Sequence, residues 1–208
     1  MKMDTKYLAL MNKSGIKRLA LGVESGSERI LNMINKGITI NQVLMTSKKL
    51  SKSEIPPIYS FMAGFPTETL KELKMTTNLI IKLLKHNKLA KSTILHCYRP
   101  LPGTELYELC VKKGLKEPTS LKEWGSYNME KIDYPWISSE MQKKISNLNF
   151  LSLFLDKKYE EIDNNLVQVF AKLYQPLARY RFENYDFRFL IGPYLKKLFV
   201  NLQNTHKK

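Results

Sequence analysis

The sequence predicts an α/β fold over residues 1–124 and an all-helical extension over residues 125–208. Three strand-like runs begin near Lys17, Pro57 and Ser92, at intervals of 40 and 35 residues, with helix-like segments between them. Strands that alternate with helices at this spacing form βαβ units with a parallel sheet. From Trp124 onward the apolar residues follow a helical period, so we place the boundary between the two segments there.

Capping patterns and helix breakers set the expected order of elements. Ser25-Gly-Ser-Glu28 and Thr39-Ile-Asn-Gln42 are capping-box patterns, in which a hydroxyl and a carboxylate or amide satisfy the amides of a first helical turn. Gly37 and Pro56-Pro57 are expected to end the helices that follow. The expected elements are a helix over 6–12, a strand over 16–23, a helix from Ser25–Glu28 to Gly37, a helix over 39–50, a strand over 58–62, a helix over 67–84 capped by Thr67, a strand over 92–98, and helices over 104–113, 139–155, 159–174 and 189–201.

The peptides that follow the three strands are the most unusual in the chain. They are Glu24-Ser25-Gly26, Gly64-Phe65-Pro66 and Tyr98-Arg99-Pro100. In parallel α/β sheets, binding sites lie at the carboxyl ends of the strands, so we expect the site there. Three βα units cannot close a barrel and would leave the edge strands unpaired. Residues 1–124 are therefore expected to belong to a larger sheet.

Composition excludes several classes of protein. The 208 residues are 43% hydrophobic and 11% aromatic, which excludes an intrinsically disordered chain. No apolar run reaches the length of a spanning helix, and no secretory signal is visible, so we expect a cytoplasmic protein without a membrane span. The net charge of +15 favours anionic partners, but 28 of the 34 cations are Lys, which is typical of a solvated surface and makes nucleic acid an unlikely partner.

Three peptides together resemble the radical S-adenosylmethionine (SAM) superfamily. They are GVESGSERILNMINKG (22–37), FMAGFPTET (61–69) and YRPLPGTELYE (98–108), followed by Pro118 and Trp124. Their order and spacing match the family over residues 4–124. The subgroup that this chain resembles most carries an N-terminal cobalamin-binding domain.

The resemblance implies the second half of a partial (β/α)6 barrel. The family holds a [4Fe–4S] cluster through CxxxCxxC, and the reduced cluster cleaves SAM to a 5′-deoxyadenosyl radical. That motif is absent from this sequence, and Cys97 and Cys110, the two cysteines present, do not belong to it. The resemblance therefore implies SAM and the cluster as cofactors, with cobalamin through a missing N-terminal domain. It also implies a complementary N-terminal fragment as a partner that carries the cluster motif.

Two charged positions carry over to the SAM site through the resemblance. Glu24, with Ser25 beside it, ends the strand where the family places a polar group that hydrogen-bonds SAM. Lys36 matches a basic position that pairs with the methionyl carboxylate. Each also has a structural interpretation: Glu24 as a cap of the next helix, and Lys36 as a solvated side chain before Gly37.

The remaining expected cofactor-binding residues lie on the next two strands. Ser60 and Met62 are placed where the family contacts ribose and adenine, although Met62 is also an ordinary core residue type. Gly64 would let the backbone approach the cofactor. Tyr98 ends the third strand near the adenine, with a core role as the alternative. We predict no catalytic residue and no metal ligand in this chain.

Three functions are compatible with the sequence. The first is the C-terminal portion of a radical SAM enzyme, truncated or split and inactive alone, with an unknown substrate. The second is a standalone basic binding or scaffold protein, for which the mixture of Arg and aromatic residues over 174–185 offers either a stacking platform or a packing surface. The third, acid–base catalysis by Glu24, is disfavoured because no second carboxylate or His follows a matching strand.

Overall fold

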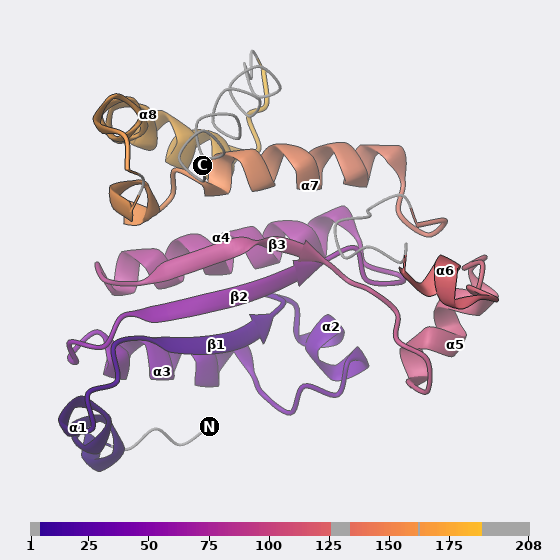
Figure 1. Ribbon diagram of the computed structural model, residues 1–208, viewed down its shortest axis with the longest axis horizontal. Helices are drawn as coiled ribbons and strands as arrows, with labels where there is room; N and C mark the ends of the chain where they lie inside the picture. Colours follow the sequence, from indigo (N-terminus) through magenta and orange to yellow (C-terminus); the bar gives the residue numbers. More distant parts are fainter. Residues whose placement is uncertain (1–4, 126–133, 162, 189–208) are drawn as a thin grey trace.

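A three-stranded sheet forms the centre of the computed structural model, which describes residues 5–125, 134–161 and 163–188 (Figure 1). The strands are β1 (Leu19–Glu24), β2 (Pro57–Ala63) and β3 (Lys91–Cys97), in the order β1-β2-β3. Both strand pairs are parallel, so all three carboxyl ends lie at the same end of the sheet. The α/β fold with three βα units and a helical C-terminal part is confirmed.

Helices connect the strands and continue the chain beyond them. They are α1 (Thr5–Lys13), α2 (Glu28–Met33), α3 (Ile40–Leu50), α4 (Leu70–His86), α5 (Glu105–Lys112), α6 (Leu121–Gly125), α7 (Ser139–Ser152), the 3-10 helix η1 (Lys157–Glu161) and α8 (Asn165–Asn184). The capping box of Thr39 with Gln42 is confirmed at the start of α3. The sequence did not predict α6. Where it predicted a helix to begin at residue 159, the structure has η1, and α8 begins only at Asn165.

Two helices begin further along the chain than their patterns indicate. Ser27, and not Ser25, is the N-cap of α2, because its hydroxyl accepts the backbone amide three residues on. Likewise Thr69, and not Thr67, caps α4 and forms a reciprocal capping box with Glu72. In both peptides several Ser, Thr and Glu residues stand close together, so the spacing rule fits more than one start.

The two faces of the sheet differ in burial. Along β2, buried residues such as Tyr59 and Phe61 alternate with half-exposed ones. The buried face shares one core cluster with Leu73 and Leu83 of α4, which lies along this side of the sheet together with α3 (Figure 1). The opposite face is less covered, and we call it the open face. The open face consists of Gly22 of β1, Ser60 and Met62 of β2, and His96 of β3.

The outer edge of β3 is covered by side chains from the helical part of the chain. Asn149 of α7 accepts a hydrogen bond from the Leu95 amide at 2.7 Å and donates one to the Leu95 carbonyl at 3.0 Å. Asp156 accepts from the Ser92 amide at 2.9 Å. These side chains replace the partners that a further strand would give, so the helical part protects this edge.

The long helix α8 continues through Pro176, whereas the sequence predicted an end at Tyr174. A proline inside a helix removes one backbone hydrogen bond. The buried Ala171, Ala178 and Phe182 hold both sides of the proline against the rest of the molecule. The expected end at Tyr174 is therefore wrong, because packing outweighs the local effect of the proline.

A single core cluster contains residues of the sheet and of α7 and α8. The division of the chain at residues 124 and 125 stays a prediction. The expected helix over 189–201 lies outside the described residues. Within the residues that the structure describes, no helix has the length and apolar character needed to cross a membrane.

Candidate functional site

The three peptides predicted to form the site come together at the carboxyl end of the sheet. Glu24 lies beside Phe61 in the pairing of β1 with β2. The Tyr98 amide donates to the Ala63 carbonyl at 2.8 Å, which places Tyr98 beside Gly64. This confirms that the parallel sheet gathers these segments, as expected for strands that run in one direction.

Glu24 and Lys36 form an ion pair with each other. Lys36 Nζ donates to Glu24 Oε1 at 2.9 Å, and the two side chains are 31% and 17% exposed, respectively. A Cβ added at Gly22 would clash with Glu24 Oε1 and lie 3.1 Å from Lys36 Nζ. Glycine at position 22 thus leaves the space in which the pair lies over β1.

The backbone at Glu24 is unusual. Its φ angle is 69°, and the register of β1 against β2 shifts between Gly22 and Glu24. A non-glycine residue with positive φ is uncommon, and a bulge re-aims the side chain at the end of a strand. Here the Glu24 side chain folds back over Gly22 toward Lys36.

Ser25 lies elsewhere, in the buried contact between the β1–α2 turn and α4. Its hydroxyl accepts from the Ser27 amide at 3.1 Å and shares a hydrogen bond with the Thr76 hydroxyl at 3.3 Å. The Gly26 amide also donates to the Thr76 hydroxyl, at 2.9 Å. The structure therefore does not bring Ser25 to the open face with the other candidates.

Ser60 and Met62 both lie on the open face. Ser60 pairs with Gly22 across β1, and Met62 pairs with His96 across β3. Both side chains are half-exposed, so Met62 is not a buried core residue. Together with the Glu24–Lys36 pair, they give the open face an acceptor, a cation, a hydroxyl and a thioether.

Gly64 has φ of 80° and is fixed from two directions. Its amide donates to Glu68 Oε2 at 2.6 Å, and its carbonyl accepts from Trp136 Nε1 at 2.9 Å. A Cβ at this position would lie 2.7 Å from Ile137 Cδ1, and the positive φ angle itself favours glycine. Tyr98 is half-buried nearby.

Sequence reasoning missed Glu68 and Trp136. Burial raises the pKa of the Glu68 carboxyl to about 7, although the Gly64 and Phe65 amides oppose this shift. The one available signal was a carboxylate that follows a strand-end glycine by four residues. Trp136 gives no such signal, because it is 72 residues from Gly64 in the sequence.

The cysteines do not fit an iron–sulfur cluster. Cys97 and Cys110 are both buried, and burial raises the pKa of the Cys110 thiol to about 11. A cluster needs thiolates, and a raised pKa favours the thiol. Among the described residues, no three His, Cys, Asp or Glu side chains are grouped in a way that could hold a metal ion.

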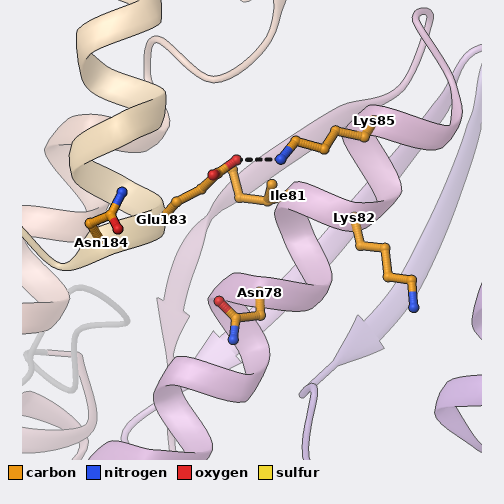
Figure 2. Close-up of a pocket in the computed structure, with 6 residues that line it drawn as sticks. All are labelled: Asn78, Ile81, Lys82, Lys85, Glu183 and Asn184. Atoms are coloured by element: carbon orange, nitrogen blue, oxygen red, sulfur yellow. Dashed lines mark ion pairs between the residues drawn. The ribbon is translucent and has the colours of Figure 1, made fainter.

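A surface groove of about 380 Å³ lies away from these residues, between α4 and α8 (Figure 2). Lys85 and Glu183 form an ion pair across it at 2.7 Å. The ion pair therefore links the two helices across the groove. None of the predicted site residues lines this groove. Its lining residues are Asn78, Ile81, Lys82, Lys85, Glu183 and Asn184.

The basic and aromatic segment after Tyr174 also makes contacts within the chain. Arg179 donates to the Leu155 carbonyl at 2.9 and 2.6 Å. Arg181 donates to the Tyr174 hydroxyl at 3.2 Å, and the Tyr174 ring packs edge-on against Phe154. The packing interpretation of this segment therefore accounts for both arginines.

Parts of this chain are similar in sequence to several known proteins, one named as a methyltransferase and two as tRNA-modifying synthases. The chain is 30% identical to an uncharacterized methyltransferase of Pyrococcus horikoshii over 157 residues, which is 74% of this chain and 32% of that protein. It is 36% identical over 86 residues to a tRNA-2-methylthio-N(6)-dimethylallyladenosine synthase of Pelagibacter ubique, covering 40% of this chain and 18% of that protein. A synthase of the same name from Hahella chejuensis is 41% identical over 69 residues, which are 31% of this chain and 15% of that protein.

The chain thus spans about a third of the first of these relatives and less than a fifth of the other two. Residues 1–80, which contain β1, β2 and the Glu24–Lys36 pair, match the radical SAM superfamily. The part of the chain that holds the first two strands and the Glu24–Lys36 pair is thus similar to the radical SAM superfamily.

Proposed function

We propose that this chain forms the SAM-binding wall of a radical SAM enzyme. The Glu24–Lys36 ion pair over Gly22 carries the proposal. An ion pair offers one anionic acceptor and one cationic donor side by side, which matches the ammonium and carboxylate of an α-amino acid group. SAM has such a group at one end, so the residues present fit this part of the cofactor.

The open face would hold the rest of SAM. Lys36 would pair with the methionyl carboxylate, and Glu24 would accept from the ammonium or from ribose hydroxyls. Ser60 would hydrogen-bond the ribose, and Met62 would offer a polarizable surface to the adenine. Gly64 and Tyr98 would border the adenine at the carboxyl end of the sheet. In this role the chain binds and orients the cofactor.

The cluster would come from a complementary segment with CxxxCxxC, because the cysteines described above do not fit it. Within the described residues no strand pairs with the outer edge of β1, whereas Asn149 and Asp156 cover that of β3. We therefore place the complementary segment at β1. Bound SAM and a reduced cluster together supply radical chemistry, and this chain alone would be inactive.

The names of the relatives suggest transfer of a methyl or methylthio group. We propose such a transfer, with a cobalamin domain preceding the core, as the reaction of the complete enzyme in the cytoplasm.

SAM binding by calorimetry tests the proposal, with this chain alone and with the complementary segment added. Replacement of Glu24 by Ala should weaken binding by about 1–3 kcal/mol, since a charged hydrogen bond is lost. Glu54→Ala, which changes an exposed carboxylate, is the matched control. If the wild-type mixture binds no SAM, or if Glu24→Ala binds as tightly as Glu54→Ala, the assignment fails.

A further inference from the structure

The turn after β2 is held by the carboxyl group of Glu68. Its Oε2 atom accepts from the Gly64 amide at 2.6 Å and from the Phe65 amide at 3.3 Å. On the other side, Trp136 donates to the Gly64 carbonyl at 2.9 Å. One carboxylate oxygen and one indole therefore fix the peptide that ends the central strand.

The second oxygen of Glu68 has a different environment. Oε1 is buried and has no hydrogen-bond partner among the described residues. Burial disfavours the charged form of the carboxyl group, and a proton on the oxygen that lacks a partner removes the charge. A cavity of about 240 Å³ is lined in part by Glu68 and by the turn that it holds. Its walls are Gly64, Phe65, Glu68, Leu70, Trp136, Ile137, Ser138 and Met141.

Among the described residues, few charged or titratable groups act on Glu68. Glu72 of α4 opposes ionisation of Glu68, and Arg29 of α2 favours it, but these two are already paired at 2.7 Å. Tyr185, after α8, is the third, and burial, together with the charge of Glu68, raises its pKa to about 12. The α7 side contributes Trp136, Ile137, Ser138 and Met141, none of which is charged. The raised pKa of Glu68, about 7, is consistent with this setting.

We propose that Glu68 is a proton-responsive positioning residue for the carboxyl end of β2. When Glu68 is ionised, its Oε2 holds the Gly64 and Phe65 amides firmly, because hydrogen bonds to a charged acceptor are stronger. When a proton is bound at Oε1, Oε2 becomes a weaker acceptor and the turn is held more loosely. Because Trp136 is bonded to the same glycine, the change reaches the start of α7.

This inference also predicts a property of the SAM site, and that part depends on the proposed function. Gly64 and Tyr98 border the proposed adenine position, so a firmer turn should favour binding. SAM affinity is expected to increase as the pH rises through 7. The increase is at most about tenfold per pH unit while one proton is linked to binding.

NMR of the full chain tests the positioning role without any ligand. In a titration from pH 5 to 9, the Gly64 and Phe65 amides and the Trp136 indole N–H should shift with a common midpoint near 7. Glu68→Gln keeps the shape of the side chain and should abolish the common shift. His96→Gln removes an imidazole from the open face and should leave it intact. A titration of the Glu68 carboxyl carbon in the wild-type protein gives the midpoint even if Glu68→Gln does not fold.

Several results would overturn the inference. A carboxyl midpoint near 4.5, an unchanged Gly64 amide, or the same amide titration in Glu68→Gln would each remove Glu68 as the responsive group. SAM titrations at pH 6 and pH 8 then separate the two proposals. If the amides titrate but SAM does not bind at either pH, the proposed function fails and the role of Glu68 in the turn stands. If SAM binds with equal pH dependence in wild type and Glu68→Gln, Glu68 does not position the site.

Discussion

At the scale of single residues, Glu68 and Glu72 show how position decides the chemistry of a carboxyl group. They lie four residues apart, yet burial raises the pKa of Glu68 to about 7 and hydrogen bonds from Arg29 lower that of Glu72 to about 2. Glu72 also accepts from the hydroxyls of Ser27 and Thr69. Glu72 thus links α2 to α4, whereas Glu68 accepts hydrogen bonds from the amides of the turn after β2.

The first prediction concerns acid stability. The folded-state pKa of Glu72 lies below its ordinary value, so its contribution to stability is present above about pH 4.5 and is lost as the pH falls toward 2. Glu72→Gln should therefore lower the free energy of unfolding at pH 6 and weaken its dependence on acid. Urea unfolding at several pH values measures this, with the exposed Glu54→Gln as control. Parallel curves for Glu72→Gln and wild type would contradict it.

The second prediction has the opposite sign. The folded-state pKa of Glu68 lies above its ordinary value, so its contribution is present at low pH and is lost as the pH rises through about 7. Glu68→Gln does not ionise and should gain stability relative to wild type between pH 6 and pH 8.5. The midpoint of urea unfolding at these two pH values measures the difference. A constant difference between the two proteins would show that Glu68 does not titrate in this range.

At the scale of elements, the contacts between helices and the sheet depend on a glycine at a close approach and on side chains that hydrogen-bond to strand or turn backbone. Gly26 lies so close to α4 that an added Cβ would clash with the backbone of Met75 and Thr76. Its amide donates to the Thr76 hydroxyl, which fixes the β1–α2 turn on α4. At the outer edge of β3, the Asn149 side chain takes the place of a strand neighbour for Leu95.

The third prediction is that Gly26→Ala destabilises the fold. Backbone atoms cannot move aside as a flexible side chain can, so overpacking should cost about 1–3 kcal/mol or more. Gly125→Ala is a matched control, because a Cβ there meets nothing within 4 Å. Chemical unfolding compares the two variants. Equal stabilities would mean that the turn and α4 separate at little cost.

The fourth prediction concerns the covered edge of β3. Asn149→Ala leaves the Leu95 amide without its partner, which should cost about 1–3 kcal/mol. Asn147→Ala, two residues away on α7, removes a half-buried amide side chain with no described hydrogen bond and should have a smaller effect. Hydrogen exchange at Leu95, faster in Asn149→Ala alone, locates the change. If exchange at Leu95 is unaltered, Asn149 does not protect the edge.

At the scale of the whole molecule, the sheet and the helical part share one core cluster. Residues as distant as Phe61 and Phe182 belong to it. The Lys85–Glu183 ion pair links α4 to α8 across the groove shown in Figure 2. The proposed boundary at residue 124 therefore separates segments that differ in secondary structure and share their core.

The fifth prediction follows from this shared core. The full chain should unfold in one cooperative step, because loss of α7 and α8 would expose the covered side of the core. Tryptophan fluorescence and far-ultraviolet circular dichroism in urea should give coincident transitions. Two separate transitions would show that the segments on either side of residue 124 fold independently.

Much of the fold could be predicted from the sequence, because strand spacing and capping are local properties. The sheet and the gathering of Glu24, Gly64 and Tyr98 at one end are examples. The mutual pairing of Glu24 with Lys36 could not be predicted, since it depends on a bulge and on space over Gly22. The burial of Ser25 depends likewise on α4, far along the chain.

The unequal edges of the sheet have a consequence for self-association. In polymer terms, a molecule must be bifunctional to propagate a chain, and each copy would need two free strand edges. Within the described residues neither outer edge has a paired strand, but side chains of Asn149 and Asp156 occupy amides at the edge of β3, which leaves β1 as the more open edge. Copies that met edge to edge would stop at a closed pair with two-fold symmetry. Within the described residues the native sheet therefore offers one open edge for pairing, and edge-to-edge growth beyond a pair is disfavoured.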